Sequence, residues 1–220
     1  MAIVLAALAA AVLAATAIAG VTVYSNSFSS KSGAGELRHA EGKHCDKSWR
    51  KKAKTVAITA KRGSTVCGYR PPVEGDADAP DHYLKATEKL GKNTPKSVRD
   101  RVYLGIGVRS AKNVGYELRV FPTKGKFKLA RLTGGNKPTF LAKGANKAIK
   151  GRGKANHMGL KANGSKVIAK VNGKRLAKTV DRNAGQVDGR KAEVMLGYKK
   201  HRSKPVSMSV GDLKLQVPNP

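Results

Sequence analysis

Acidic, aromatic and sulfur-containing side chains are all scarce in this chain, and each shortage argues against a class of function. The 220 residues include 14 Asp and Glu against 44 Lys and Arg, so a carboxylate pair for glycoside hydrolysis has few sources. Aromatic residues make up 5% of the sequence, which is few for the platforms on which proteins stack bases or sugars. Two cysteines without a Cys-x-x-Cys spacing exclude a redox motif.

Recognised catalytic and nucleic-acid-binding motifs are missing as well. There is no Gly-x-Ser-x-Gly elbow, and residues 151–154 (GRGK) lack the Ser or Thr and the glycine spacing of a phosphate loop. No RNA- or DNA-binding signature accompanies the basic composition. We therefore expect that the protein is not an enzyme and that it meets nucleic acid only non-specifically.

Charge is absent from the first thirty residues, and residues 1–24 consist mainly of Ala, Leu, Val and Ile. As a helix, residues 2–24 would be about 30 Å long, which is the thickness of a bilayer's hydrocarbon core. Three interpretations stay open: an uncleaved single-pass anchor, a cleaved secretory signal ending near Ala17-Ile18-Ala19, and a buried helix. We favour the anchor, with the following domain outside the cytoplasm, and a secreted protein is the alternative. Lys31, Arg38 and Lys43 favour the opposite orientation, although the positive-inside rule is weak for long domains.

The two cysteines favour export. Cys45 and Cys67 can form one disulfide, and such bonds persist mainly in oxidising compartments. Two unrelated thiols are an alternative. A zinc site that adds His39 and His44 is another, but the spacing of these four residues matches no recognised zinc pattern.

Turn signals predict an all-β domain. Asn163-Gly164 and Asn172-Gly173 separate the strand-like runs 158–162, 166–171 and 174–180, which indicates a three-stranded meander with type I′ turns. Further strands are predicted at residues 55–60, 82–87, 102–108, 116–121, 126–132 and 193–198, with two more within 206–217. Residues 31–43 are read as a linker or loop. No long helical period follows residue 30, so these short strands indicate a sandwich or barrel.

Several stretches also occur in an order that resembles a known family. They are residues 24–28 (YSNSF), 116–121 (YELRVF), 157–160 (HMGL) with 171–174 (VNGK), and 210–215 (VGDLKL). This order resembles the concanavalin A-like, laminin G-like jelly roll, over roughly residues 21–218. Residues 67–82 resemble part of an uncharacterised actinobacterial group of membrane-anchored proteins.

The resemblance implies an antiparallel β-sandwich over residues 25–220, preceded by an apolar helix at 1–24. It also implies carbohydrate binding, although the aromatic platforms of sugar-binding members are few here. Val210 and Gly211 replace the Phe and first Asp of the family's closing pattern. Glu74-Gly-Asp76 begins like the motif of laminarinase-type glycosidases, but Ala79 stands where its last Glu would be.

Residues 74–82 hold the one acidic cluster in the sequence. Asp76, Asp78 and Asp81 are candidate ligands for a structural calcium ion, although the Gly and the distal Glu of an EF-hand are missing. An acidic turn that pairs with nearby Lys and Arg is the simpler interpretation, because Ala79-Pro80 marks a turn. A catalytic role is a third. No other cofactor is indicated.

The formal charge of +30 is the strongest functional signal, because so basic a surface attracts polyanions in a salt-dependent way. We expect a membrane-anchored binding module for anionic cell-wall polymers or acidic glycans. Its alternatives are a divergent glycan hydrolase of the same fold and an envelope interaction protein with non-specific polyanion affinity. Two carboxylates about 5–9 Å apart in a cleft would favour the hydrolase, and basic side chains gathered on one sheet face would favour the binding module. The candidate polyanion-binding residues are Lys143, Lys147, Lys150, Arg152, Lys154, Lys199, Lys200, Arg202 and Lys204.

Overall fold

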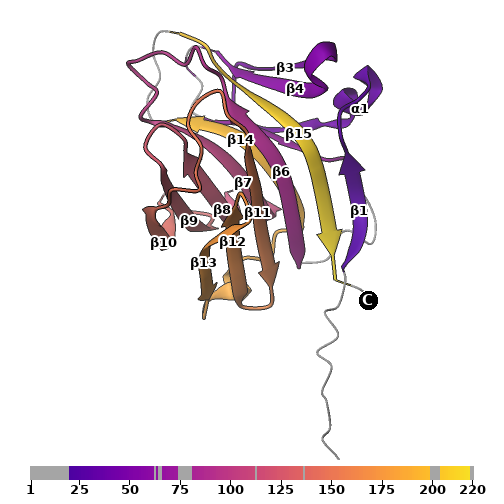
Figure 1. Cartoon of the computed structure of the whole chain (residues 1–220). Coiled ribbons are helices and arrows are strands. Elements are labelled where there is room, and N and C mark those ends of the chain that lie inside the picture. Colours follow the sequence, from indigo (N-terminus) through magenta and orange to yellow (C-terminus); the bar gives the residue numbers. More distant parts are fainter. Residues whose placement is uncertain are drawn as a thin grey trace, which may run out of the picture.

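Two antiparallel sheets packed face to face make up the fold (Figure 1). The computed structural model describes residues 20–61, 63, 66–73, 81–111, 113–135, 137–198 and 204–218. Sheet A has the strand order β13-β12-β11-β6-β15-β4-β3, with β1 also paired to β15, and sheet B has the order β10-β9-β8-β7-β14-β5-β2. The all-β sandwich expected from the sequence is confirmed.

The strands of sheet A are β1 (Val21–Asn26), β3 (Cys45–Arg50), β4 (Thr55–Ala60), β6 (His82–Leu90), β11 (Asn156–Asn163), β12 (Lys166–Val171), β13 (Lys174–Val180) and β15 (Val206–Val217). Those of sheet B are β2 (Arg38–Glu41), β5 (Val66–Arg70), β7 (Val102–Ala111), β8 (Val114–Phe121), β9 (Lys126–Thr133), β10 (Thr139–Ala145) and β14 (Lys191–Tyr198). The described helices are short: α1 (Lys31–Glu36), η1 (Lys51–Ala53) and η3 (Ala184–Gln186).

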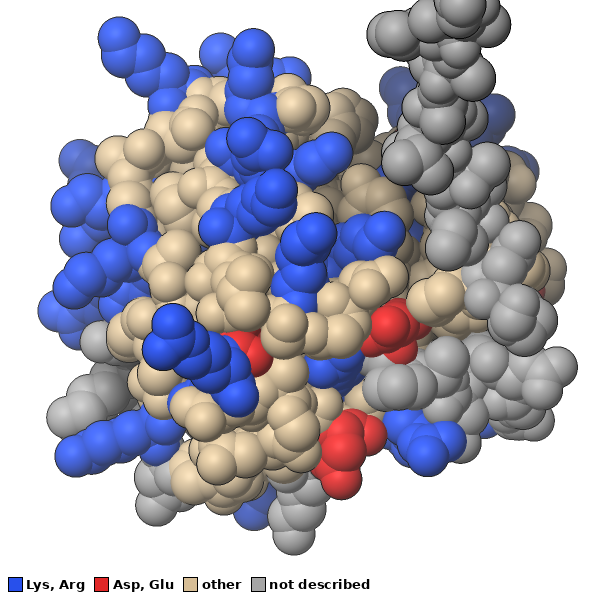
Figure 2. Space-filling view, turned by 90° about the horizontal axis from the view of Figure 1, so that it is seen from below, with Lys and Arg blue, Asp and Glu red and all other residues tan. Residues whose placement is uncertain are grey.

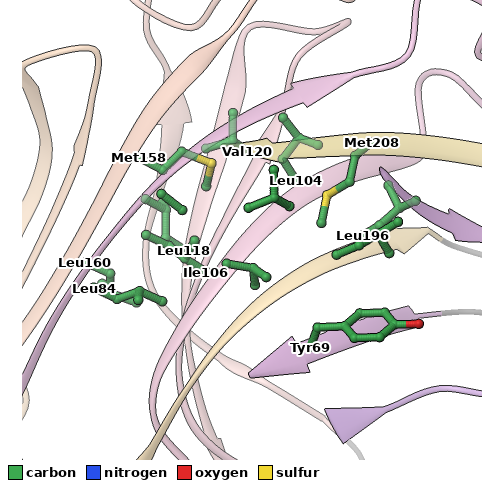
Figure 3. Close-up of a cluster of buried hydrophobic side chains, with 14 of the residues drawn as sticks. Tyr69, Leu84, Leu104, Ile106, Leu118, Val120, Met158, Leu160, Leu196 and Met208 are labelled. Atoms are coloured by element: carbon green, nitrogen blue, oxygen red, sulfur yellow. The ribbon is translucent and has the colours of Figure 1, made fainter. Parts of the chain in front are cut away.

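Apolar side chains from the facing sides of both sheets form the core between the layers (Figure 3). Leu84 and Leu160 of sheet A and Leu104, Ile106 and Leu118 of sheet B are fully buried there. Each such side chain contributes about 1.5–3 kcal/mol through the area it removes from water. Because side chains alternate along a strand, the same packing turns the intervening residues toward the two outer faces.

The beginning of the chain corrects an expectation. Residues 21–24, expected as the end of an apolar helix, belong to β1, where Val21 lies opposite Val217 of β15. Val21, Thr22 and Val23 are β-branched and favour a strand. Residues 1–19 of the expected anchor lie outside the described residues. None of the described helices is both long enough and apolar enough to cross a bilayer.

The segment expected as a linker or loop, residues 31–43, instead carries α1 and the edge strand β2. Ser30 caps α1, because its hydroxyl accepts a hydrogen bond from the Gly33 backbone N–H. The polar, glycine-containing sequence of this segment gave no signal for either the helix or the strand.

The meander is confirmed, with one change of turn. Asn172 and Gly173 both have positive φ, as a type I′ turn requires. In the other hairpin Asn163 pairs with Lys166, so the two central residues of the turn are Gly164 and Ser165. Of these two, Gly164 alone has positive φ, so this turn is not the predicted type I′. The two strands expected within 206–217 are one strand, β15, with a register shift between Gly211 and Lys214.

The cysteine pair forms the predicted disulfide. Cys45 lies on β3 of sheet A and Cys67 on β5 of sheet B, with their Cα atoms 5.7 Å apart. The bond therefore joins the two sheets near one edge, where β3 has a single strand neighbour. The Cys45 thiol belongs to no zinc site, since both cysteines are consumed in the disulfide.

Removing the disulfide tests its role as a link between the sheets. We expect the double variant Cys45→Ala, Cys67→Ala to lose about 3 kcal/mol of unfolding free energy, because the unfolded chain regains the entropy of the open loop. Urea unfolding followed by circular dichroism measures this loss. The single variant Cys45→Ser under reducing conditions should match reduced wild type, and equal stability of oxidised and reduced wild type would contradict the expectation.

One acidic side chain lies in the core. Glu88 on β6 is fully buried between the sheets, and neither carboxylate oxygen has a hydrogen bond of full geometry among the described residues. Burial raises the pKa of Glu88 well above its usual value, and the backbone N–H of Gly105 opposes this only in part. Burial therefore favours the neutral form of this side chain in the folded protein.

Glu88 should make stability fall as pH rises. Above about pH 4.3 the unfolded chain releases this proton while the folded protein keeps it. The unfolded state then binds fewer protons than the folded state, so the free energy of unfolding decreases as pH rises. We expect Glu88→Gln to remove this contribution and to be more stable than wild type above pH 7. Urea unfolding between pH 5 and 9 measures the slope. Asp188→Asn, which removes an exposed carboxylate outside the core, is the control, and an unchanged slope in Glu88→Gln would refute the assignment.

Candidate functional site

A basic pocket of about 600 Å³ lies at the β9–β10 side of sheet B. Lys126 and Lys128 alternate with the buried Phe127 and Leu129, so both lysines point to the outer face. Lys143 lies opposite Lys128 on the neighbouring strand. The full lining is Asp100, Arg101, Phe121, Lys124, Lys126, Phe127, Lys128, Lys143, Gly144 and Ala145. Five cations and one carboxylate therefore line this pocket, together with Phe121 and Phe127.

Aromatic rings connect this pocket to the centre of sheet B. Phe121 contacts the ring of Tyr103 at a centroid distance of 5.6 Å, and the Arg119 guanidinium lies 5.2 Å from the centre of the Tyr103 ring. The Lys128 ammonium lies 4.5 Å from the centre of the Phe140 ring, which is 41% exposed. Few as the aromatic residues are, several gather on this side of the fold and offer flat apolar surface between charged groups.

A second pocket, of about 300 Å³, is lined by three glutamates. Glu41 comes from β2, Glu117 from β8 and Glu193 from β14. Register brings them together, because Glu117 and Glu193 are both paired with Gly107, and Glu41 is paired with Gly68. Tyr103, Ser110 and Arg119 also line this pocket, and the β7–β8 turn and the β9–β10 connection close one side of it.

Glycine makes room for this convergence. A Cβ atom at Gly68 would lie 2.5 Å from Cγ of Glu41, and it would lie 3.3 Å from both Oε1 of Glu41 and Oε2 of Glu193. The two carboxylate oxygens are therefore no farther apart than twice that distance. At Gly197 a Cβ atom would lie 2.0 Å from Cζ of Tyr103, so the phenol ring rests directly on the backbone of β14.

The three carboxyl groups have different electrostatic surroundings. Glu117 forms an ion pair with Arg119, with 2.5 Å between Oε2 and Nη2. Burial, then the carboxylates of Glu193 and Glu117, raise the pKa of Glu41 to about 7, while Arg119 opposes the increase. Burial also raises the pKa of Glu193, against a hydrogen bond from the Ser110 hydroxyl. The positive charges of Arg70 and Lys191 oppose this increase in the pKa of Glu193 only in part. At neutral pH the pocket thus holds Glu41 as a mixture of its charged and neutral forms.

Among the candidate polyanion-binding residues, Lys143 lies in the basic pocket. Arg152 is used within the fold, where its Nη1 donates to the backbone carbonyl oxygens of Lys92 and Thr94. Lys147, Lys150, Lys154 and Lys204 are exposed and do not line it. Lys199, Lys200 and Arg202 lie outside the described residues. For all of them a role in binding stays a prediction.

The calcium candidates are only partly within the described structure. Oδ1 of Asp81 accepts hydrogen bonds from Nη2 of Arg109 at 2.5 Å and from the Gly164 backbone N–H at 2.9 Å. This agrees with the interpretation of an acidic side chain paired with a nearby cation. Asp76 and Asp78 lie outside the described residues. Within the described part of the chain, no three His, Cys, Asp or Glu side chains are placed to share a metal ion.

Basic side chains are not confined to one face. Figure 2 shows Lys and Arg spread over the end of the sandwich seen from below, with only a few acidic side chains between them. Lys85, Lys161 and Lys170 occupy outward positions of sheet A, while Lys126 and Lys128 occupy those of sheet B. The charge is therefore distributed, and the basic pocket is a local feature of shape rather than of charge alone.

Sequence reasoning missed most of this site. The alternation Glu117, Arg119, Phe121 on one predicted strand was the available signal, since these three side chains share a face. Glu41 and Glu193 carried no such signal, because their approach to Glu117 depends on strand order and register. Lys124, Lys126 and Lys128 were visible only as part of a basic background.

Comparisons with known proteins identify the fold and not a family. No protein-family model matches the sequence, and no curated protein matches it. Among solved structures, a Bacillus subtilis protein of unknown function with a galectin-like fold has a TM-score of 0.62 at 11% identity, covering 91% of this chain and 98% of that one. A botulinum neurotoxin type C, whose entry into cells depends on interaction with two ganglioside molecules, has a TM-score of 0.55 at 9% identity. The match covers 84% of this chain and 44% of the toxin chain.

A sialidase is a further structural neighbour, with a TM-score of 0.55 at 11% identity. The match covers 83% of this chain but 17% of the sialidase. Identities this low show a shared galectin-like, jelly-roll sandwich. They do not transfer a ligand or an activity.

Proposed function

We propose that the chain is a non-catalytic, membrane-anchored module that binds acidic glycans or anionic cell-wall polymers outside the cytoplasm. The observation that carries the proposal is the basic pocket on sheet B, in which five cations line a cavity of about 600 Å³ together with Phe121 and Phe127. A cavity of this size lies within the range of small-molecule and sugar sites, on the order of 300–1,000 Å³. The ammonium and guanidinium groups can hold carboxylate, sulfate or phosphate groups, while the rings contact the apolar faces of sugars.

The structural neighbours support this proposal in a general way. A toxin that interacts with gangliosides and a sialidase share the sandwich, so this fold occurs in proteins whose names refer to glycans or glycolipids. The disulfide supports a place outside the cytoplasm, since such bonds are rare in reducing compartments. Anchoring is inferred from the apolar sequence of residues 1–19 alone, since residues 21–24 belong to β1.

Hydrolysis of the same glycans is a second candidate function, favoured by the glutamate pocket. The oxygens of Glu41 and Glu193 each lie 3.3 Å from one point above Gly68, so they are no farther apart than twice that distance. The spacing of about 5–5.5 Å in retaining glycosidases falls within this limit. The pocket, at about 300 Å³, has half the volume of the basic pocket, which leaves less room for a chain that continues on both sides of a bond to be cut. We therefore place binding before hydrolysis.

Charge reversal in the basic pocket tests the proposed function. We expect Lys126→Glu, Lys143→Glu to weaken binding to polygalacturonate and heparin at least tenfold and to reduce the salt dependence of binding, because fewer counterions are released. The matched control is Lys166→Glu, Lys170→Glu, which makes the same charge change at exposed positions of β12 on sheet A. Isothermal titration at 50 and 200 mM salt measures both effects.

Two results would overturn the proposal. If wild type binds none of these polymers at 50 mM salt, the module is not a binder of acidic glycans. If both double variants weaken binding equally, affinity follows net charge alone, and the protein is an interaction protein with non-specific polyanion affinity.

A further inference from the structure

Two Asn-Gly pairs occur in the meander, and their asparagine side chains are held very differently. Asn163-Gly164 lies at the turn between β11 and β12, and Asn172-Gly173 lies at the turn between β12 and β13. The two glycines have similar surroundings, because a Cβ atom at either one would meet nothing within 4 Å. The difference between the pairs therefore lies in the asparagines.

Asn172 is hydrogen-bonded through both atoms of its side-chain amide. Its Oδ1 accepts from the His157 backbone N–H at 2.9 Å. Its Nδ2 donates to the Ala148 carbonyl oxygen at 2.7 Å and to Oδ1 of Asn156 at 3.1 Å. Asn156 is itself fully buried. The Asn172 amide is thus fixed to β11 and to the loop that precedes it.

Asn163 has no such restraint. Its side chain is exposed, and it makes no hydrogen bond with any other residue in the described part of the chain. The next residue, Gly164, has a φ of 50° and presents no side chain to shield the backbone between them. Asparagine is a thermolabile residue. Its side-chain carbon reacts with the following backbone nitrogen when the amide is free to turn and the next residue is small.

We propose that Asn163 is a site of spontaneous deamidation and that Asn172 is protected from it. The backbone nitrogen of Gly164 attacks Cγ of Asn163, its proton passes to the leaving amide nitrogen, and ammonia departs from a five-membered cyclic imide. Water then opens the imide at either carbonyl group. One opening gives aspartate, and the other gives isoaspartate, in which the main chain passes through Cβ and Cγ. Water is the one co-reactant.

The turn that would react also fastens other segments of the fold. The Gly164 N–H donates to Oδ1 of Asp81 at 2.9 Å, and the Gly164 carbonyl oxygen accepts from Nη2 of Arg109 at 2.8 Å. The Ser165 carbonyl oxygen accepts from the Asp181 backbone N–H at 2.8 Å. Isoaspartate lengthens the main chain by one carbon just before Gly164, so these contacts cannot all be kept. Deamidation should therefore release the turn from Asp81 and Arg109.

The two Asn-Gly pairs can be compared within one protein. We expect Asn163 in the folded, full-length chain to deamidate at least tenfold faster than Asn172 at pH 8 and 37 °C. The rate at Asn163 should rise several-fold from pH 6 to pH 8, because the attacking nitrogen must lose its proton. Peptide mapping by mass spectrometry measures both rates, and incubation in heavy-oxygen water marks the products that form before digestion.

The unfolded chain is the control for local sequence. In guanidinium chloride the contacts of Asn172 are lost, so the two pairs should react at similar rates. Asn163→Gln is the matched variant, since its amide would have to close a larger ring and should give no product in the same time. Equal rates at Asn163 and Asn172 in the folded protein would overturn the proposal. So would a folded protein in which Asn163 stays intact while the unfolded chain reacts.

Release of the turn is measured on the isoaspartate form, which ion exchange separates by its added negative charge. We expect amide hydrogen exchange at Gly164 to be at least tenfold faster in this form. Asn163→Asp adds the same charge without lengthening the main chain, and it should keep the Gly164 N–H protected. Unchanged protection in the isoaspartate form would show that deamidation does not release the turn. The turn shares no residue with the basic pocket, so these results are independent of the proposed function.

Discussion

The apolar contact between the inner faces of the two sheets is the constraint on which the rest of this structure depends. Leu84, Leu104 and Leu160 can be buried only if alternate residues on the same strands face outward. The excess of thirty positive charges must then be carried by outer faces, edges and loops. Packing thus determines where charge can go, and the pockets occupy positions that the core leaves free.

The few acidic residues are also placed by the packing of the sandwich. Asp181 and Asp81 are used in contacts with Arg131 and Arg109, which fasten loops and hairpins to the sandwich. Burial favours the neutral form of Glu88 in the core. Among the described residues, three glutamates of sheet B instead line one pocket, where Gly68 and Gly107 leave no side chain between them. Their grouping is the more informative because so few carboxylates are available.

Local sequence predicted the strands and turns well, and long-range pairing poorly. Asn172-Gly173 predicted its hairpin because the turn needs only two residues with positive φ. The cysteine pair was predictable because two thiols allow one bond. Residues 139–145 gave no strand signal, so β10 and with it the wall of the basic pocket were missed. Glu41, Glu117 and Glu193 meet through strand order, which residues far apart in sequence do not reveal.

Antiparallel pairing of β1 with β15 has a mechanical consequence. Val21 lies opposite Val217, so β1 begins and β15 ends at the same pole of the sandwich (Figure 1). A pulling force between these two ends would peel β1 from β15 one residue pair at a time, because the load falls on each hydrogen bond in turn. A force that pulls the two sheets apart would instead load the core and the Cys45–Cys67 bond together. The domain is thus better braced against tension between its sheets than against tension between its two ends.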